Sequence, residues 1–208
     1  MRAAPKITRR FWKFFRVVPA PPVSNGSMAA PTVLVILAEG FEEIEAVTPI
    51  DVLRRAGSKV TVASLSEGIH VTGRNGITIH ADAALAKIEG TPFDCVLLPG
   101  GPGVGLLRKD PRVASLLKGQ SGAGGWIAAI CAAPVVLKDS GLLAGRRYTA
   151  HFSVAGELPD ALLGERVIVD GRLITSRGAG TALDFGLMVV ERLFSSEMAL
   201  EVARSVCA

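Results

Sequence analysis

Short apolar runs alternate with amphipathic segments from Thr32 to the end of the chain, and this alternation limits the possible folds more than any other property of the sequence. Four of the runs have the length and composition of buried strands: TVLVILA, KVTVASL, DCVLLPGG and WIAAI. Parallel strands need crossover connections, usually helices, which then cover both faces of the sheet. The sequence therefore predicts a single α/β domain with a mostly parallel sheet.

Turn and capping residues divide the rest of the chain into further elements. Two hairpins are expected, with turns at residues 74–76 and 170–171. Gly57 is expected to end the helix that begins in EGFEEIEAV, and Ser195 or Ser196 to cap the last helix. PGVG is predicted as a glycine-rich turn and RYTAH as a short strand. No internal repeat or second domain is found.

The stretch WIAAICAAPVVL is predicted as a buried strand that stops at Cys131 and turns into a helix. Pro134 suits a first helical turn, which tolerates a missing N–H. Ala129 and Ala133 place small residues where a nucleophile elbow carries glycines. Such a corner would expose the sulfur at the carboxyl edge of the sheet and aim backbone N–H groups at it, which favours the thiolate.

The net charge of +4 is concentrated at one end of the chain. Six of the 23 Lys and Arg residues lie in residues 1–27, which contain no Asp or Glu, so the rest has 17 basic and 19 acidic residues. A mildly acidic body argues against a nucleic-acid surface. No apolar run approaches the roughly 20 residues of a membrane span, so no membrane association is expected.

Residues 1–27 have the pattern of an organelle transit peptide. Basic and apolar residues recur on separate helical faces, and the proline-rich linker VPAPPVSNGS follows. A mitochondrial destination is predicted, with a plastid second; a disordered leader without an address is the alternative reading. Met28 stands just before the first strand, so translation from it would place the protein in the cytoplasm. Residues 28–208 are predicted to form the folded domain.

Three cysteines are too few for a disulfide framework and suit a reducing compartment. Cys95 lies in an apolar strand and is expected to be an inert core residue, whereas Cys207 lies one residue from the end. The chain has no CxxC or HExxH spacing, so no metal site is predicted.

The loop after the first strand falls at the carboxyl edge of the sheet, where ligands of open parallel sheets bind. It carries four carboxyl groups, on Glu39, Glu42, Glu43 and Glu45. Pro49 cannot donate to the carbonyl of Glu45, which places Glu45 on a distorted first turn near that edge. Beside a Cys131 thiolate, a buried carboxyl would have a raised pKa and become a proton donor near neutral pH. The alternative is that all four simply complement a helix N-terminus.

Two more groups are predicted at the same edge. Gly100 and Gly101 follow a buried strand, and their backbone N–H groups are candidates for binding an oxyanion; an ordinary tight turn is the alternative. His151 is a candidate base or orienting group for Cys131, and a purely structural histidine is the alternative. The convergence of these loops with Cys131 predicts an active site.

Four motifs, in this order, resemble the DJ-1/ThiJ/PfpI superfamily and, within it, the branch of the Parkinson-disease-linked protein deglycase: VLVILAEGFEEIEAVTPIDVLRRAG, DCVLLPGG, AAICAAP and TSRGAGT. The resemblance runs from Thr32 to the end and leaves the leader outside. It implies a flavodoxin-like three-layer α/β sandwich with a nucleophile elbow, a homodimer and no cofactor.

The resemblance also implies roles for individual residues. Cys131 matches the nucleophile, Glu45 the acid that hydrogen-bonds the sulfur, and His151 the nearby histidine. Gly101 and Ala132 match the positions whose backbone N–H groups form the oxyanion pocket, and the neighbouring Gly100 is predicted to bind the oxyanion or substrate with them. Arg74 matches the arginine that reaches toward the site of the partner subunit.

The function implied is a glutathione-independent glyoxalase or deglycase. It would convert α-oxoaldehydes such as methylglyoxal, or early glycation adducts of proteins and nucleotides, to hydroxy acids, in defence against carbonyl and oxidative stress. The alternative is a redox-sensing chaperone or partner-binding dimer that uses oxidation of Cys131. A peptidase comes third.

Overall fold

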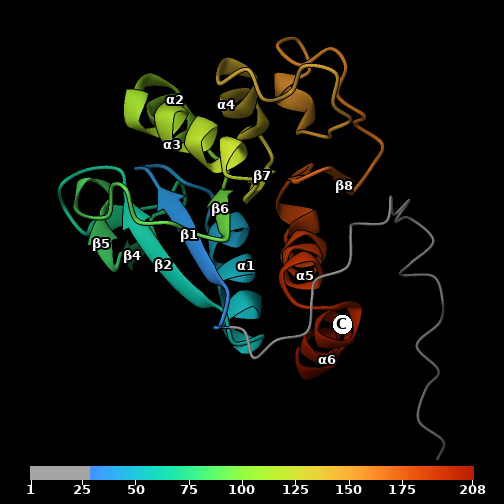
Figure 1. The fold of residues 1–208 in the computed structure, drawn as a ribbon. Helices are drawn as coiled ribbons and strands as arrows, with labels where there is room; N and C mark the ends of the chain where they lie inside the picture. Colours follow the sequence, from blue (N-terminus) through green and yellow to red (C-terminus); the bar gives the residue numbers. More distant parts are fainter. Residues whose placement is uncertain (1–28) are drawn as a thin grey trace, which may run out of the picture.

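The computed structural model describes residues 29–208, so the predicted leader lies outside the described residues. Its centre is a seven-stranded sheet in the order β5-β2-β1-β6-β7-β9-β8 (Figure 1). The strands are β1 (Thr32–Leu37), β2 (Lys59–Ser64), β5 (Ala83–Ala84), β6 (Cys95–Leu98), β7 (Trp126–Ile130), β8 (Val167–Asp170) and β9 (Leu173–Ser176). Every neighbouring pair is parallel except β8 with β9, which form the predicted hairpin.

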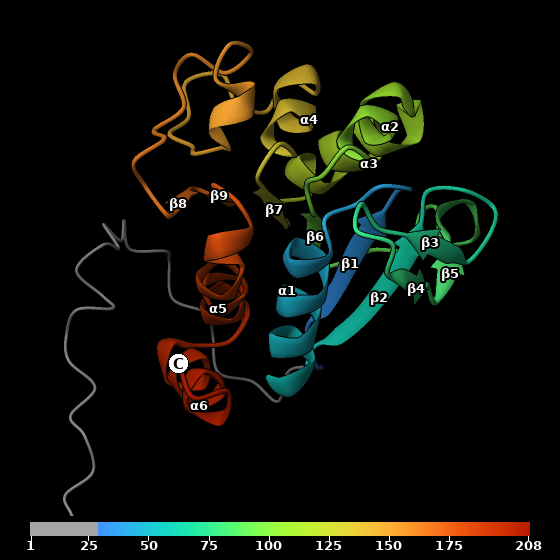
Figure 2. The ribbon, with the colours of Figure 1, turned by 180° about the vertical axis from the view of Figure 1, so that it is seen from behind.

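Helices cover both faces of this sheet (Figures 1 and 2). The helices are α1 (Glu43–Arg55), α2 (Val104–Lys109), α3 (Pro111–Gly122), α4 (Pro134–Asp139), α5 (Ala182–Leu193) and α6 (Ser196–Ser205). Short 3-10 turns are η2 (Leu85–Lys87), η3 (Phe152–Val154) and η4 (Ala179–Thr181). The predicted flavodoxin-like three-layer sandwich is confirmed, and Ser195 caps α6 by accepting from the Met198 N–H at 3.3 Å.

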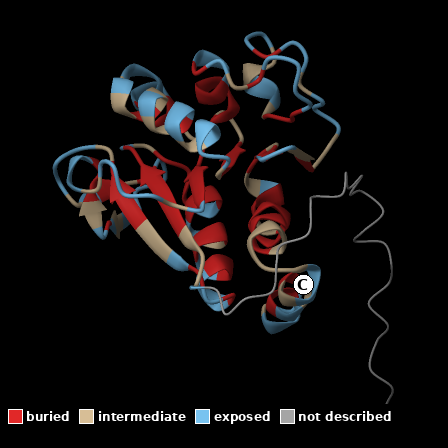
Figure 3. Ribbon diagram, viewed as in Figure 1, coloured by how far each residue is buried: buried red, intermediate tan, exposed pale blue. Residues whose placement is uncertain are grey.

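Alternation along β1 explains why both faces are covered. Val33, Val35 and Leu37 point into one core with α1, α5 and α6, whereas Leu34 and Ile36 point into the other with α2, α3 and α4. All five side chains are fully buried, and Figure 3 shows the same burial through the central strands. A strand buried on both sides is the arrangement that continuous apolar runs predict.

The second predicted hairpin, β3 (His70–Thr72) with β4 (Thr78–His80), lies outside the main sheet. His70 and His80 face each other across it, with ring centroids 4.9 Å apart. Both are exposed, as expected of surface residues. The hairpin turn contacts the start of α1, which brings it to the carboxyl edge of the sheet.

Two sequence predictions about local structure are wrong. RYTAH is not a strand. Both edges of β7 are already paired, one with β6 and the other with β9, so the RYTAH segment runs across the ends of the strands instead of joining the sheet. There the N–H of Thr149 donates to Oγ1 of Thr175 at 3.0 Å and the N–H of His151 to the carbonyl of Cys131 at 2.9 Å. PGVG is only partly a turn, since α2 begins at Val104 within it and buries Leu107 against the sheet.

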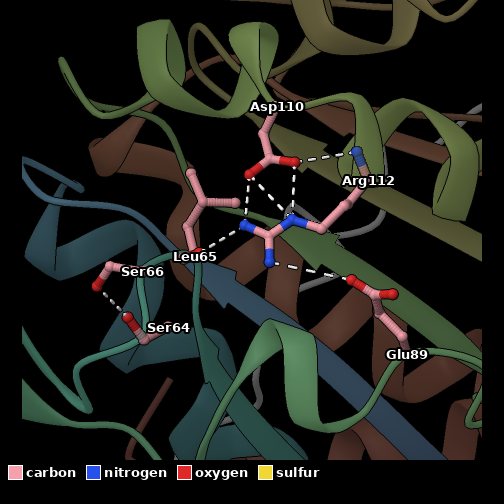
Figure 4. Close-up of polar contacts among 6 residues, drawn as sticks. All are labelled: Ser64, Leu65, Ser66, Glu89, Asp110 and Arg112. Carbon is pink, nitrogen blue, oxygen red and sulfur yellow. Dashed lines mark hydrogen bonds and ion pairs between the residues drawn. The ribbon is translucent and has the colours of Figure 1, made fainter.

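Arg112 attaches the start of α3 to the carboxyl end of β2 (Figure 4). Asp110 caps α3 by accepting from the N–H of Arg112 at 2.9 Å, and it also pairs with the guanidinium at 2.6 Å. The same guanidinium donates to the carbonyl of Leu65 at 3.0 Å. These contacts hold α3 in place over β6 and β7, the strands that lead into the candidate site.

Gly186→Ala is expected to destabilise the fold by about 1–3 kcal/mol, because α5 crosses α1 at this glycine. A Cβ there would lie 2.6 Å from Cγ2 of Val52 and 3.0 Å from the backbone Cα of Pro49. The matched control is Gly119→Ala in α3, where a Cβ meets nothing within 4 Å; better helix propensity should stabilise it by up to about 1 kcal/mol. Urea unfolding measures both, and equal effects of the two changes would contradict the close packing.

Candidate active site

Cys131 occupies the corner between β7 and α4 in a strained backbone conformation. Its φ is 65°, and within residues 29–208 only Cys207 is another non-glycine residue with positive φ. Residues with a Cβ adopt this region at a cost of about 1–3 kcal/mol, so surrounding contacts must hold them there. The Cys131 N–H donates to the carbonyl of Ser176 at 2.8 Å, and its own carbonyl accepts from His151 at 2.9 Å. The predicted elbow is present.

Glu45 lies buried beside Cys131, with 1% of its surface exposed. Its Oε2 accepts from the N–H of Gly100 at 2.9 Å, so this predicted oxyanion donor is bonded to the carboxyl group of Glu45. A Cβ on Gly100 would lie 2.6 Å from both that oxygen and Cβ of Cys131, and 3.1 Å from Sγ. The backbone of Gly100 therefore packs directly against the cysteine and the carboxyl group, where no side chain fits.

The four glutamates of the first loop have separate structural roles. Glu42 caps α1 by accepting from the N–H of Glu45 at 2.8 Å, and Glu39 accepts from the N–H of Thr72 at 3.2 Å. Glu43 accepts from the N–H and the side-chain amide of Asn75 at 2.7 and 2.9 Å. Three of the carboxyl groups thus stabilise the helix start or the β3–β4 hairpin. Among these four, only Glu45 contacts Cys131. It lies one turn before Pro49, and α1 runs without interruption from Glu43 to Arg55, so the distorted first turn expected from the sequence is not seen.

Burial raises the pKa of the Glu45 carboxyl to about 7. A hydrogen bond to Cys131 opposes this shift, the charge of Glu42 adds to it, and the N–H groups of Gly100 and Ala179 oppose it. The sequence prediction of a carboxyl that exchanges a proton near neutral pH agrees with this raised pKa.

Burial and then the charge of Glu45 raise the pKa of the Cys131 thiol to about 12. The N–H groups of Ala132 and Gly101 hydrogen-bond the sulfur and lower it, but by less. The prediction that the corner favours a free thiolate is therefore wrong beside an ionised Glu45. The Glu45 contributions exist only while that carboxyl is charged, so the pair holds one proton and one negative charge between them.

Close backbone contacts also surround Gly101. Its φ is 91°, and a Cβ there would lie 2.5 Å from the carbonyl oxygen of Gly40 and 2.6 Å from the N–H nitrogen of Glu42. Only glycine meets both conditions without displacing the loop. The N–H of Gly101 and that of Ala132 thereby reach the sulfur from two different loops, the arrangement needed to stabilise an oxyanion formed beside it.

His151 contacts the elbow through its backbone, and its ring is oriented by the next turn. Nδ1 accepts from the N–H of Ser153 at 3.2 Å and lies 2.8 Å from Oγ of Ser153, so the neutral ring carries its proton on Nε2. A Cβ placed on Gly178 would lie 3.3 Å from Cδ2 of the His151 ring and 3.9 Å from Oε1 of Glu45, so both side chains approach this glycine. Among the described residues no hydrogen bond joins the ring to Cys131.

Arg74 lies in the exposed turn of the β3–β4 hairpin. Its N–H donates to the carbonyl of Phe41 at 2.9 Å. The neighbouring Gly73 packs so closely on Glu43 that a Cβ would lie 2.5 Å from the carboxyl group. The turn is thus held at the start of α1, and the role of Arg74 toward a partner stays a prediction.

The loop between β9 and α5 also contributes to the site, although none of its residues was predicted there. The Thr181 hydroxyl donates to the carbonyl of Gly178 at 2.8 Å and lies 2.6 Å from the hydroxyl of Ser176. These bonds shape the turn whose Ala179 N–H reaches Glu45. The signal was available in TSRGAGT, where hydroxyl residues stand on both sides of a pair of glycines.

Other parts of the described chain offer fewer candidates. Residues 29–208 contain no group of three or more His, Cys, Asp or Glu side chains placed to hold a metal ion. Hollows of about 620 and 550 Å³ flank Arg112, away from Cys131. Cys95 is buried, and burial raises its pKa, so it is inert as expected. No helix in the described part is long and apolar enough to cross a membrane.

Residues 31–192 match the model of the DJ-1/PfpI family. The chain belongs to this family. It is 44% identical to protein dj-1beta of Drosophila melanogaster over 177 residues, which cover 83% of this chain and 95% of that protein. It is 38% identical to the glutathione-independent glyoxalase DJR-1.2 of Caenorhabditis elegans over 172 residues, or 81% and 91% of the two chains.

Solved structures of DJ-1 proteins have the same fold. The crystal structure of Drosophila melanogaster DJ-1beta superposes with a TM-score of 0.83 at 41% identity, covering 86% of this chain and 99% of that one. Oxidized DJ-1 of Toxoplasma gondii superposes with a TM-score of 0.82 at 37% identity, covering 86% and 98%. Family membership and the flavodoxin-like fold, both expected from the motifs, are confirmed.

Gly100→Ala is expected to slow alkylation of Cys131 about tenfold or more, because the new methyl group must displace the cysteine or the Glu45 carboxyl. Mass-spectrometric rates with iodoacetamide measure this in a Cys207→Ser background. Gly105→Ala is the control, since a Cβ there meets nothing within 4 Å. A wild-type rate for Gly100→Ala would contradict the packing described.

Proposed function

We propose that this protein is a cofactor-independent glyoxalase or deglycase that acts on α-oxoaldehydes through Cys131. The observation that carries the proposal is the buried Glu45 carboxyl, with a pKa of about 7, hydrogen-bonded to a cysteine that also accepts from two backbone N–H groups. This combines a nucleophile, a proton carrier and an oxyanion pocket within one site. The name of the glyoxalase relative supports the assignment.

The first step uses the proton shared by the pair. Transfer of that proton from sulfur to Glu45 leaves the Cys131 thiolate, which attacks the aldehyde carbon and forms a C–S bond. The aldehyde oxygen becomes the oxyanion of a hemithioacetal, stabilised by the N–H groups of Gly101 and Ala132. Proton transfer from Glu45 to that oxygen completes the step and returns the carboxylate.

Glu45 is then the base for the second step. It removes the proton from the former aldehyde carbon and delivers one to the neighbouring carbon, while the hemithioacetal hydroxyl gives up its proton and the former ketone oxygen gains one. The aldehyde carbon is thereby oxidised as the ketone carbon is reduced. The resulting thioester is hydrolysed by water, which releases a hydroxy acid and restores the thiol. Methylglyoxal and water thus give lactate without an external oxidant or reductant. The His151 ring and the Glu45 carboxyl both approach Gly178, and His151 is proposed to orient the substrate or the water.

Deglycation uses the same atoms on a different substrate. In an early adduct the former aldehyde carbon is bonded to the nitrogen or sulfur of a protein or nucleotide. That bond breaks, the amine or thiol leaves with the proton of the adduct hydroxyl, and Cys131 attacks the aldehyde carbon that is set free. The partly exposed position of Cys131 is compatible with such a substrate. Glyoxalase and deglycase activities therefore differ in the leaving group more than in the residues involved.

A homodimer is part of this proposal. Ile44 and Val47 are 53% and 47% exposed on one face of α1, and Ile77 on the neighbouring hairpin is 57% exposed. A second copy covering this apolar face would bring Arg74 to the partner's site, as the family resemblance implies. Light scattering of the purified protein measures the molar mass that tests it, and a monomer would contradict the arrangement.

Redox sensing is the second candidate function, and the same pair of side chains supports it. Hydrogen peroxide transfers oxygen to a cysteine thiolate, giving a sulfenate and water, and a second equivalent gives a sulfinate. A protonated Glu45 would donate a hydrogen bond to the sulfinate oxygens. Selective oxidation of Cys131 without any turnover of methylglyoxal would favour this function over the enzymatic one.

Cys131→Ser is expected to lower kcat/KM for methylglyoxal about 1,000-fold or more, since serine is not ionised beside Glu45. Glu45→Gln should lower it about 100-fold or more by removing the proton carrier. Lactate formation without glutathione is the measurement. The control is Glu39→Gln, whose carboxyl contacts the hairpin instead of Cys131; absence of turnover in the wild type would refute the enzymatic proposal.

The pH dependence of the reaction follows from the Glu45–Cys131 pair. Below the pKa of Glu45, about 7, both groups are protonated and no thiolate forms. As the pH rises through about 7 the pair loses one proton, so kcat/KM should rise to a plateau. Activity profiles from pH 5 to 9 check this, and Glu45→Gln should lose that acid limb. An activity that falls through this range in the wild type would contradict the assignment.

A further inference from the structure

Phe152 is an apolar aromatic side chain left almost entirely in solvent. It is 74% exposed, more than any other large hydrophobic side chain in the described residues. The next most exposed are aliphatic and lie on other elements, Ile77 on the β3–β4 hairpin and Ile44 on α1. An exposed aromatic ring next in sequence to His151, whose backbone N–H binds the carbonyl of Cys131, is a candidate contact for a substrate.

Its location connects it to the candidate active site. Phe152 directly follows His151, whose N–H donates to the carbonyl of Cys131 at 2.9 Å. The two rings lie with centroids 4.0 Å apart and planes inclined at 35°. Cδ2 of the same imidazole lies 3.3 Å from a Cβ placed on Gly178, and Oε1 of Glu45 lies 3.9 Å from that point. Phe152 therefore extends the site outward from Glu45 through His151.

The local backbone holds the ring in this position. Phe152 opens the η3 turn, which His151 caps by accepting from the N–H of Ser153 at Nδ1. The same contact fixes the plane of the imidazole against which Phe152 packs. The exposed face of the phenyl ring is thus presented on a preformed turn, and binding an aromatic group there needs little ordering of the protein.

We propose that Phe152 is a specificity-determining residue that selects α-oxoaldehydes with an aromatic substituent. This inference rests on the proposed function. The aldehyde carbon binds Sγ of Cys131, and the aryl group on the ketone carbon extends past His151 to stack on Phe152. The reaction is unchanged: an arylglyoxal and water give an aryl hydroxy acid, with one carbon oxidised and its neighbour reduced. Glyoxal, which has no substituent, makes no contact with the ring.

The test compares kcat/KM for phenylglyoxal with kcat/KM for glyoxal. Phe152→Ala should lower the ratio about 3- to 10-fold, the range that one aromatic pair supplies, and leave glyoxal turnover within about twofold of the wild type. Phe152→Tyr should keep the ratio because it keeps the ring. The matched control is Leu106→Ala, an exposed apolar residue on α2. An unchanged ratio in Phe152→Ala would overturn the proposal.

Binding measured without turnover separates this inference from the proposed function. In Cys131→Ser protein, calorimetry with mandelate, the hydroxy acid from phenylglyoxal, should show tighter binding than with lactate, and Phe152→Ala should remove the difference. If neither aldehyde is turned over but this difference persists, the glyoxalase assignment fails and the aromatic subsite stands. Equal binding of both acids overturns the subsite, as does a change of molar mass in Phe152→Ala, which would place the ring in a subunit contact.

Discussion

Burial of the Glu45 carboxyl beside Cys131 is the interaction on which the candidate site depends. Two ionisable groups at this depth cannot both carry a charge without a large desolvation cost, so the pair retains a proton that either member can hold. The first turn of α1 supplies the carboxyl, the loop after β6 supplies the Gly100 N–H that binds it, and the turn before α5 supplies the Ala179 N–H. Three segments at one edge of the sheet therefore set the pKa of the Glu45 carboxyl group together.

The strained elbow depends equally on distant segments. Cys131 keeps a positive φ because its N–H is bonded to the carbonyl of Ser176 and its carbonyl to the N–H of His151. Ser176 ends β9, and His151 lies on the segment that crosses the strand ends before β8. Glycine at residues 100 and 101 then lets the facing loop approach without side chains. The corner is thus rigid, which suits a nucleophile that must meet a substrate, a donor pair and an acid at fixed distances.

Most of the fold could be predicted from the sequence because its signals are local. The apolar runs, the two hairpin turns and the caps at Gly57 and Ser195 all depend on neighbouring residues, and all are found in the structure. The prediction of a strand at RYTAH was wrong because an extended segment joins a sheet only beside a strand with an unpaired edge. Both edges of β7 are paired, with β6 and with β9. The helix α2, which begins within PGVG, was not predicted because its six residues are too few to show a clear period.

By itself, the sequence determined the apolar strands of the parallel sheet, the sharp corner at Cys131, and the position of Glu45 at the carboxyl edge of the sheet. Each follows from backbone chemistry within a few residues. Only the tertiary structure decided which carboxyl groups hold the hairpin, that the buried pair raises rather than lowers the thiol pKa, and that the loop before α5 belongs to the site. Those properties depend on burial and on distances between segments more than 30 residues apart, and no local pattern encodes either.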